Sequence, residues 1–303
     1  MTIEDMPEQV DKILSKITGT DNVTSTEMSS NPMGSGSVFY CDARNQMQLN
    51  DFIDDQRPKL VALVGFAGYG KSTFIGSLYH VLTQRLSYNG FSFVDSETYV
   101  GFERRVFLRR VNKDNSSDTK RTILGENDIL DMKLRTEKGI SYRILISDKA
   151  GETYQTYLSK DKSIEGDVVI ENSDLLLFFV DADFDSRSLA KHNLVMDNYR
   201  SLLTRLKEKG KIGASTAYAL VYTKSDLVAT EDRKIKLESR KTEIKALFEG
   251  IIGVTCEQEF EVNSKAPDNE PLNDAFVMLI RPLPPKESVV SLNWVKDEIE
   301  TEQ

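Results

Sequence analysis

The sequence predicts an α/β fold in which helices cover both faces of a mostly parallel central sheet. Short apolar runs alternate with amphipathic segments of helical length, and a glycine-rich turn joins the first apolar run to the helix that follows it. Runs without alternating polar residues are typical of strands buried on both faces, as in parallel sheets. The helical segments between them supply the right-handed crossovers that parallel strands require.

Each expected strand is a short apolar run that ends at a glycine or at polar residues. In chain order these runs are Lys59–Gly65, Ile129–Leu134, Tyr142–Ile146, Asp174–Val180, Tyr218–Tyr222 and Phe260–Val262. The run Asp174–Val180 is the most apolar of them. We therefore expect it at the centre of the sheet, where burial is most complete.

Each expected helix repeats apolar residues at intervals of three or four positions. In chain order the segments are Met6–Ile17, Ser72–Leu86, Val195–Leu206, Arg233–Phe248 and Leu272–Ile280. The third ends before Gly210, a residue type that often follows a helix C-terminus. The first is open to two interpretations, because it either packs on its own domain or binds a partner.

We expect three regions along the chain. Residues 1–58 hold the N-terminal helix and a flexible linker, because residues 19–37 are rich in Thr, Ser, Asn and Gly. Residues 59–283 form the α/β domain, with an insertion around 87–127, and residues 284–303 form an acidic C-terminal tail. The insertion is either a solvated charged face or a surface for an acidic partner. Its basic residues are Arg104, Arg105, Arg109, Arg110, Lys113, Lys120 and Arg121.

The composition argues against several classes of function. A chain of 303 residues that is 39% hydrophobic can bury one large core. Its formal net charge of −9 opposes binding to nucleic acid or anionic lipid. Cys41 and Cys256 form neither a disulfide framework nor a metal-ligand cluster. No apolar run is long enough for a membrane span and the C-terminus lacks a prenylation signal, so we expect a cytoplasmic protein.

The glycine-rich turn matches a phosphate-binding pattern. Residues 65–72 are Gly-Phe-Ala-Gly-Tyr-Gly-Lys-Ser, which fits G-x-x-x-x-G-K-[ST] between a buried strand and a helix. Its backbone N–H groups and the helix N-terminus favour phosphate, while Lys71 is expected to bridge the terminal phosphates and Ser72 to bind Mg²⁺. The expected nucleotide contacts here are Gly65, Gly68, Tyr69, Gly70, Lys71, Ser72 and Thr73.

Three further motifs follow the ends of expected strands. Residues 148–151 are Asp-Lys-Ala-Gly, residues 223–226 are Thr-Lys-Ser-Asp, and residues 264–266 are Ser-Lys-Ala. The Asp226 carboxylate can accept both the ring N–H and the exocyclic amine of guanine, which adenine cannot offer together. Leaving such a carboxylate unpaired against the wrong base would cost roughly 1–3 kcal/mol, so the motif favours guanine.

In order and position these motifs resemble those of the Ras-like GTPases, over roughly residues 59–280. The resemblance implies a P-loop NTPase fold in which Asp148 holds Mg²⁺ through water and the Gly151 N–H senses the γ-phosphate. It also implies that Thr223 belongs to the nucleotide-binding residues, and that Lys224 lies along the base and supports its loop.

The last motif and the switch threonine match the family less closely. Ser264 and Lys265 resemble the start of the S-A-K signature, whose backbone meets the guanine carbonyl, but its second and third residues are interchanged. The threonine that ligates Mg²⁺ in the triphosphate state is expected before Ile129–Leu134. We prefer Thr122 to Thr119 for this role, and both could instead be ordinary loop residues.

One catalytic position departs from the Ras-like pattern. Glu152 stands where those enzymes place the glutamine that orients the attacking water. A carboxylate there could orient water, yet its charge repels the γ-phosphate and predicts slow hydrolysis. Gln155 could replace the missing glutamine if this loop is helical, because it would lie about one turn further on.

These observations predict a guanine-nucleotide-dependent molecular switch that hydrolyses GTP to GDP and phosphate with Mg²⁺, and that has a protein effector or regulator as partner. Two alternatives stay open. One is a GTP- or GDP-binding sensor or scaffold without appreciable hydrolysis, and the other is a P-loop ATPase or kinase in which Asp226 is incidental. Residues 148–152 and the long insertion also resemble bacterial double-GTPase families linked to conflict and defence systems. The oligomeric state stays open.

Overall fold

The computed structural model describes residues 42–52, 57–111 and 129–264, all of which belong to one compact unit, Tyr40–Gln303. The expected helices Met6–Ile17 and Leu272–Ile280 lie outside the described residues, as do Thr119, Thr122 and Lys265. The α/β fold predicted from the sequence is confirmed. Within the described ranges, none of the helices has the length and hydrophobicity needed to cross a membrane.

The sheet has seven strands in the order β2-β3-β4-β1-β5-β6-β7. All neighbours from β4 to β7 are parallel, and β3 runs antiparallel to both β2 and β4. The bounds are β1 Lys59–Val64, β2 Phe91–Asp95, β3 Ile129–Thr136, β4 Ser141–Ser147, β5 Leu175–Asp181, β6 Tyr218–Thr223 and β7 Gln258–Val262.

The centre of the sheet differs from the sequence prediction. β1 is the middle strand, and β5, although its seven residues are all buried, lies beside it. Hydrophobicity reports burial, and both strands are buried on both faces, so it could not decide which of the two is central.

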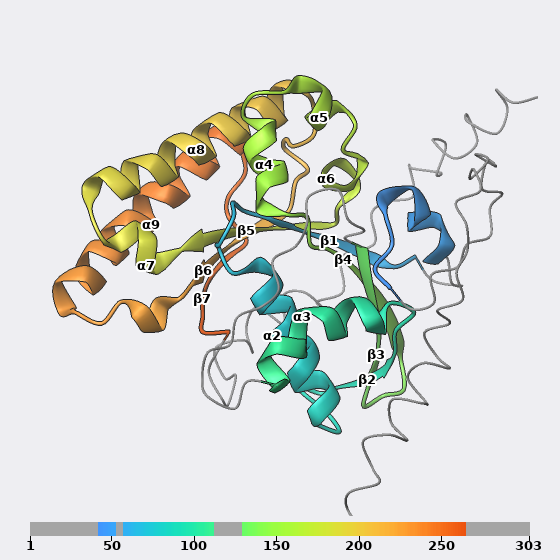
Figure 1. Ribbon diagram of the computed structural model, residues 1–303. Helices are drawn as coiled ribbons and strands as arrows, with labels where there is room; N and C mark the ends of the chain where they lie inside the picture. The colour runs from blue at the N-terminus through green and yellow to red at the C-terminus, as the bar shows by residue number, and fades with distance from the viewer. Residues whose placement is uncertain (1–41, 53–56, 112–128, 265–303) are drawn as a thin grey trace, which may run out of the picture. The chain divides into compact units, whose positions relative to one another are not determined.

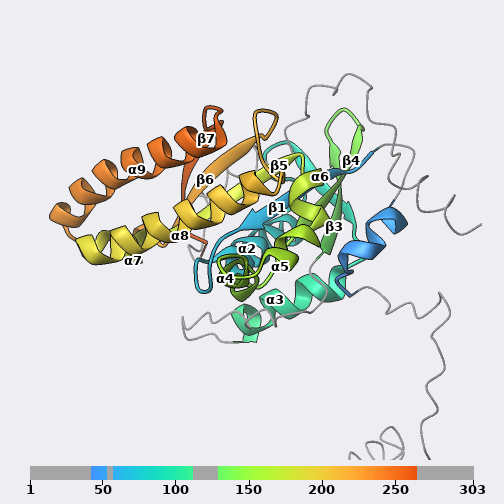
Figure 2. The same ribbon diagram turned by 90° about the horizontal axis from the view of Figure 1, so that it is seen from above.

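Helices cover both faces of this sheet. Figure 1 shows α2 and α3 on one face and α4, α8 and α9 on the other. Figure 2 shows α8 and α9 side by side, and they pack against each other. The bounds are α2 Lys71–Gln84, α3 Tyr99–Val111, α4 Gly151–Tyr157, α5 Asp161–Glu165, α6 Val168–Asn172, α7 Ala182–Ser186, α8 Leu189–Glu208 and α9 Glu231–Ile252, with two 3₁₀ helices, η2 Gln46–Phe52 and η3 Ser225–Leu227.

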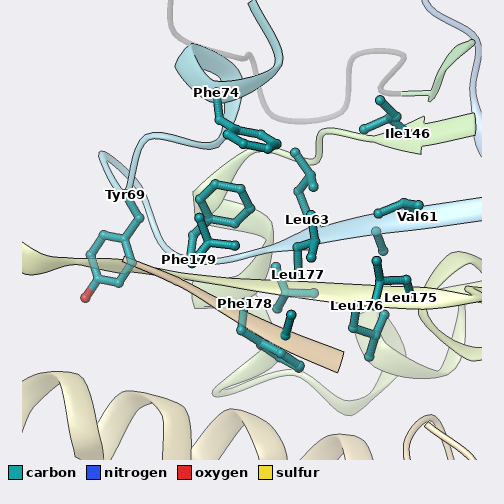
Figure 3. Packing of buried hydrophobic residues seen from close by; sticks show 14 of the residues in the cluster. Val61, Leu63, Tyr69, Phe74, Ile146, Leu175, Leu176, Leu177, Phe178 and Phe179 are labelled. Carbon is teal, nitrogen blue, oxygen red and sulfur yellow. The ribbon is translucent and has the colours of Figure 1, made fainter. Parts of the chain in front are cut away.

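The core lies between the sheet and these helices. Figure 3 shows apolar side chains of β1 and β5 beside Phe74 of α2. The rings of Phe74 and Phe179 meet edge to face with their centroids 5.4 Å apart. Burying a side chain of this size contributes roughly 1.5–3 kcal/mol, so the first helix is firmly held on the strands that precede the motif loops.

The insertion contains two elements that the sequence patterns did not predict, β2 and α3. α3 buries Phe102 and Val106, and its Gly101 approaches so closely that an added Cβ would lie 2.7 Å from Leu130 Cδ2. On α2, a Cβ added at Gly76 would lie 3.2 Å from Val106. The apolar face of α3 is short and surrounded by charge, which hides its periodicity in the sequence, yet it packs tightly on α2 and β3.

Candidate functional site

The glycine-rich turn of residues 65–72, called the phosphate loop below, connects β1 to α2. Gly68 and Gly70 have φ angles of 79° and 85°, in the left-handed region that glycine adopts without strain. No side chain caps α2, whose N-cap residue is Gly70. The loop therefore lies in front of the N-terminus of α2, which carries a partial positive charge. Because no capping side chain neutralises that charge, the arrangement is suited to an anion.

Lys71 is the buried cation of this loop. It is 6% exposed, and its Nζ donates to the carbonyl oxygens of Gly65 at 2.6 Å and Phe66 at 3.4 Å. Burial lowers the pKa of Lys71 to about 8, while the charges of Asp148 and Glu152 act to raise it. A phosphate group placed beside Nζ would add negative charge and favour the charged ammonium.

Asp148 follows β4 directly and is fully buried. Ser72 Oγ donates to its Oδ1 at 3.1 Å, which joins two of the three residues that the sequence analysis assigned to Mg²⁺. Arg105 Nε donates to Oδ2 at 2.7 Å. The sequence placed Arg105 in a solvated basic cluster or on a partner surface. This assignment was wrong, because the residue is 8% exposed and faces the candidate site.

Gly151 brings the Asp-Lys-Ala-Gly motif into contact with the phosphate loop. A Cβ added at Gly151 would lie 2.1 Å from the Ala67 nitrogen, a distance that no side chain tolerates. Gly151 also begins α4, in which Glu152 is partly buried and Gln155 is exposed. The helical condition under which Gln155 lies one turn beyond Glu152 is therefore met.

Two buried tyrosines fix α4 on the domain. Tyr154 Oη donates to the Leu63 carbonyl at 2.7 Å, and Tyr157 Oη donates to Asp167 Oδ2 at 2.6 Å. Asp167 also pairs with Lys149 Nζ at 2.7 Å and caps α6. Asp167 thus connects the motif loop to the end of α4. Its partners lie in three separate segments, so no local sequence pattern identifies Asp167 as part of the site.

The Thr-Lys-Ser-Asp motif also meets the phosphate loop. Thr223 Oγ1 donates to the Tyr69 carbonyl at 2.9 Å, and a Cβ on Gly70 would lie 3.3 Å from the Thr223 side chain. Lys224 has a φ of 58°, an uncommon conformation for a residue other than glycine, and its Nζ pairs with Asp181. Asp226 is exposed on η3, so its carboxylate is accessible to a base.

The last motif reaches the same region through α2. The Ser264 carbonyl accepts a hydrogen bond from Ser77 Oγ, and Ser264 is 8% exposed. The described motif residues therefore gather at the carboxyl ends of β1, β4, β6 and β7, the edge at which open α/β sheets bind ligands. Thr73, half-buried on α2, belongs to this edge as well.

The side chains at this edge fit Mg²⁺. The Ser72 hydroxyl and the Asp148 carboxylate are hard oxygen donors that already touch each other. Within the described ranges, no cluster of three or more acidic, histidine or cysteine side chains could hold a metal by itself. Mg²⁺ is typically bound by one or two protein oxygens together with substrate phosphates, which is the donor set that this edge can offer.

Comparison with known proteins identifies one family. A family model described as Double-GTPase 2 matches residues 59–278. None of the curated proteins gives a significant match.

Two solved structures are among those similar to this chain. One is a crystal structure of a mutation variant of SsGBP, with 13% identity, a TM-score of 0.39, and coverage of 74% of this chain and 57% of that one. The other is the signal recognition particle receptor SRb-GTP/SRX complex from Chaetomium thermophilum, with 15% identity, a TM-score of 0.40, and coverage of 73% and 96%. This chain thus matches little more than half of the SsGBP variant.

Proposed function

The chain belongs to the Double-GTPase 2 family, and from this premise we propose that it binds a guanine nucleotide and hydrolyses GTP to GDP and phosphate. The observation that carries the proposal is that the Asp-Lys-Ala-Gly and Thr-Lys-Ser-Asp motifs both contact the phosphate loop. Gly151 packs against Ala67, and Thr223 donates to the Tyr69 carbonyl. A single ligand lying on this loop would reach the residues for phosphate and for base together.

Each part of the nucleotide would meet a different motif. The backbone N–H groups of residues 65–73 and the Lys71 ammonium would bind the phosphates. Asp226 would accept two hydrogen bonds from guanine, with Lys224 along the ring and the backbone of residues 264–265 at the base carbonyl. Thr223 would hold the base loop against the phosphate loop.

Ser72 and Asp148 would hold Mg²⁺, with Thr122 as a third candidate in the triphosphate complex. The metal, when bound, would supply positive charge to the phosphates. The chain's own task is to position the attacking water. The oxygen of this water forms a bond to the γ-phosphorus while the bond from that phosphorus to the bridging oxygen breaks. GDP leaves with the bridging oxygen, and the water proton passes to the released phosphate or to solvent.

Gln155 is our first candidate for orienting this water. It lies four residues after Gly151, which contacts the phosphate loop, so the two residues lie on the same side of α4. The charge of Glu152 acts against the burial that lowers the pKa of Lys71, and the same negative charge opposes the approach of a triphosphate. We therefore propose slow intrinsic hydrolysis, with faster turnover when a protein regulator binds.

A nucleotide-dependent switch would act through Gly151 and the segment that contains Thr122. The hydrogen bonds of Tyr154 and Tyr157 hold the rest of α4 on the domain, so a rearrangement of residues 151–157 has to break them. The competing function is a GTP or GDP sensor without appreciable hydrolysis. Glu152 is the observation that favours it.

The test is calorimetric titration of the nucleotide-free protein with GTP, GDP and ATP in Mg²⁺, followed by phosphate release from the same preparation. Guanine-selective binding with release of phosphate supports a GTPase. Guanine-selective binding without release, with or without candidate partners, favours the sensor. Equal binding of ATP would contradict the proposed role of Asp226.

A further inference from the structure

We propose that Arg105 competes with Mg²⁺ for Asp148, so that this arginine sets the metal concentration at which the protein retains its nucleotide. The inference rests on the proposed function, because it takes Asp148 as a metal-binding residue. It adds a residue from the insertion, which the motifs do not include, to the candidate site.

The pair is buried and well formed. The Arg105 side chain is 9% exposed and that of Asp148 is fully buried, with 2.7 Å between Nε and Oδ2. Ser72 Oγ donates to the other carboxylate oxygen. Both oxygens of Asp148 are therefore engaged, one by a cation and one by the hydroxyl expected at the metal.

The fold holds Arg105 in this position. Its Nη1 donates to the Gly101 carbonyl at 2.9 Å, one turn earlier on α3. The helix itself is held on α2, where the rings of Phe102 and Tyr79 stack with their centroids 4.6 Å apart. The fold therefore holds the Arg105 guanidinium beside Asp148, through a hydrogen bond to its own helix and through the packing of that helix on α2. A surface arginine would lack both constraints.

Electrostatics gives the sign of the effect in two independent ways. A buried carboxylate that loses its cation is strongly destabilised, and a metal ion can restore the missing positive charge. A guanidinium that stays close to the carboxylate repels a divalent cation. Both effects predict that a neutral residue at position 105 strengthens Mg²⁺ binding. If Arg105 served only to orient Asp148, its loss would weaken Mg²⁺ binding.

The experiment uses the full chain loaded with a fluorescent GDP analogue, with the nucleotide release rate measured against the free Mg²⁺ concentration. For Arg105→Gln we expect the Mg²⁺ concentration at the midpoint of nucleotide retention to fall by about tenfold or more. A change of about tenfold corresponds to the weakest coupling measured for close charge pairs. Calorimetric titration of Mg²⁺ into the GDP-loaded protein should show the same shift. Neither readout depends on hydrolysis.

Two more variants make the result specific. Arg104→Gln is the matched control, because the Arg104 side chain is next to Arg105 in the sequence but is 55% exposed and pairs with Asp42 at 2.8 Å. Its midpoint should equal that of the unmodified protein. Arg105→Lys keeps the charge without the Nε contact, so its midpoint should fall by less than that of the glutamine variant, and it tests the direction if the latter does not fold.

An unchanged or raised midpoint in the Arg105 variants would overturn the inference while leaving the proposed function intact. Failure of the unmodified protein to retain guanine nucleotide at any Mg²⁺ concentration would overturn the proposed function, and the inference with it.

Discussion

Lys71 and Glu152 place opposite charges beside the phosphate loop. Burial lowers the pKa of Lys71, and the two nearby carboxylates only partly offset that effect. The carboxylate of Glu152 favours the charged lysine but disfavours the anionic ligand that the lysine is expected to bind. Two charges of opposite sign thus have opposing effects on a phosphate bound to the same loop.

Replacing Glu152 with glutamine should accelerate GTP hydrolysis. The amide can still orient water, and it removes a negative charge from the neighbourhood of the γ-phosphate. We expect an increase of about tenfold, equivalent to ~1.4 kcal/mol of barrier. Single-turnover phosphate release measures it, with Glu171→Gln, an exposed carboxylate paired with Lys211, as the control. A fall in rate would instead show that Glu152 accepts the proton of the attacking water.

At the scale of elements, the loop that we propose to bind the base is held by a clamp between α7 and α9. Arg233 Nη2 donates to the Asp183 carbonyl, to Asp183 Oδ1 and to Ser186 Oγ, each at 2.8 Å. Its Nη1 donates at 3.3 Å to the carbonyl oxygen of Leu227, which is the last residue of η3. One guanidinium therefore holds the segment that carries Asp226 against its neighbours.

Arg233→Ala should weaken the preference for guanine more than it weakens phosphate binding. Without the clamp, the loop that carries Asp226 would adopt a wider set of conformations. Ordering this loop when the base binds would then lower the affinity for guanine. We expect the ratio of the Kd for ADP to the Kd for GDP to fall by about tenfold. Arg200→Ala, in an exposed pair with Asp197, is the matched control. An unchanged ratio would mean that Arg233 only stabilises the fold.

A second element contact predicts a dependence of stability on pH. Asp131 of β3 accepts from the Glu97 N–H at 2.8 Å and from Thr98 Oγ1 at 3.1 Å, which ties β3 to the turn before α3. Burial raises the pKa of Asp131 from 3.8 to about 6, against the lowering effect of Arg143. The folded protein therefore binds this proton more tightly than the unfolded chain does.

The stabilisation from that proton is complete below pH 3.8 and is lost as the pH rises through about 6. The thermal midpoint of the unmodified protein should accordingly fall relative to that of Asp131→Asn between pH 4 and pH 7, because asparagine does not titrate in this range. Thermal unfolding at several pH values measures the difference between the two midpoints. A constant difference would show that Asp131 titrates near its ordinary value.

At the scale of the whole molecule, the motif residues could be predicted because each follows the carboxyl end of a strand. The apolar runs gave β1, β4, β5, β6 and β7, and parallel strands bring their ends to one edge of the sheet. The strand positions and the order of the motifs were thus enough to predict which loops meet, and the Double-GTPase 2 match confirms the family that the motifs indicated.

The remaining parts of the site depend on contacts that leave no local pattern. Arg105 reaches Asp148 across 43 residues. In the sequence, Arg105 is one basic residue among several. Its burial follows from the packing of α3 on α2, and α3 was not predicted. Long-range packing of a short, charge-rich helix is invisible to periodicity, so a site residue on such a helix could not be found from the sequence.

We propose that the chain selects guanine through Asp226. The measurement that tests this role is titration of the unmodified protein and of Asp226→Asn with GTP, XTP and ATP. The unmodified protein should prefer GTP, while the variant should lose GTP binding and gain XTP binding, because an amide can donate to the oxygen that xanthine carries in place of the guanine amine. An unchanged preference in the variant, or equal binding of ATP by the unmodified protein, would show that Asp226 does not select the base.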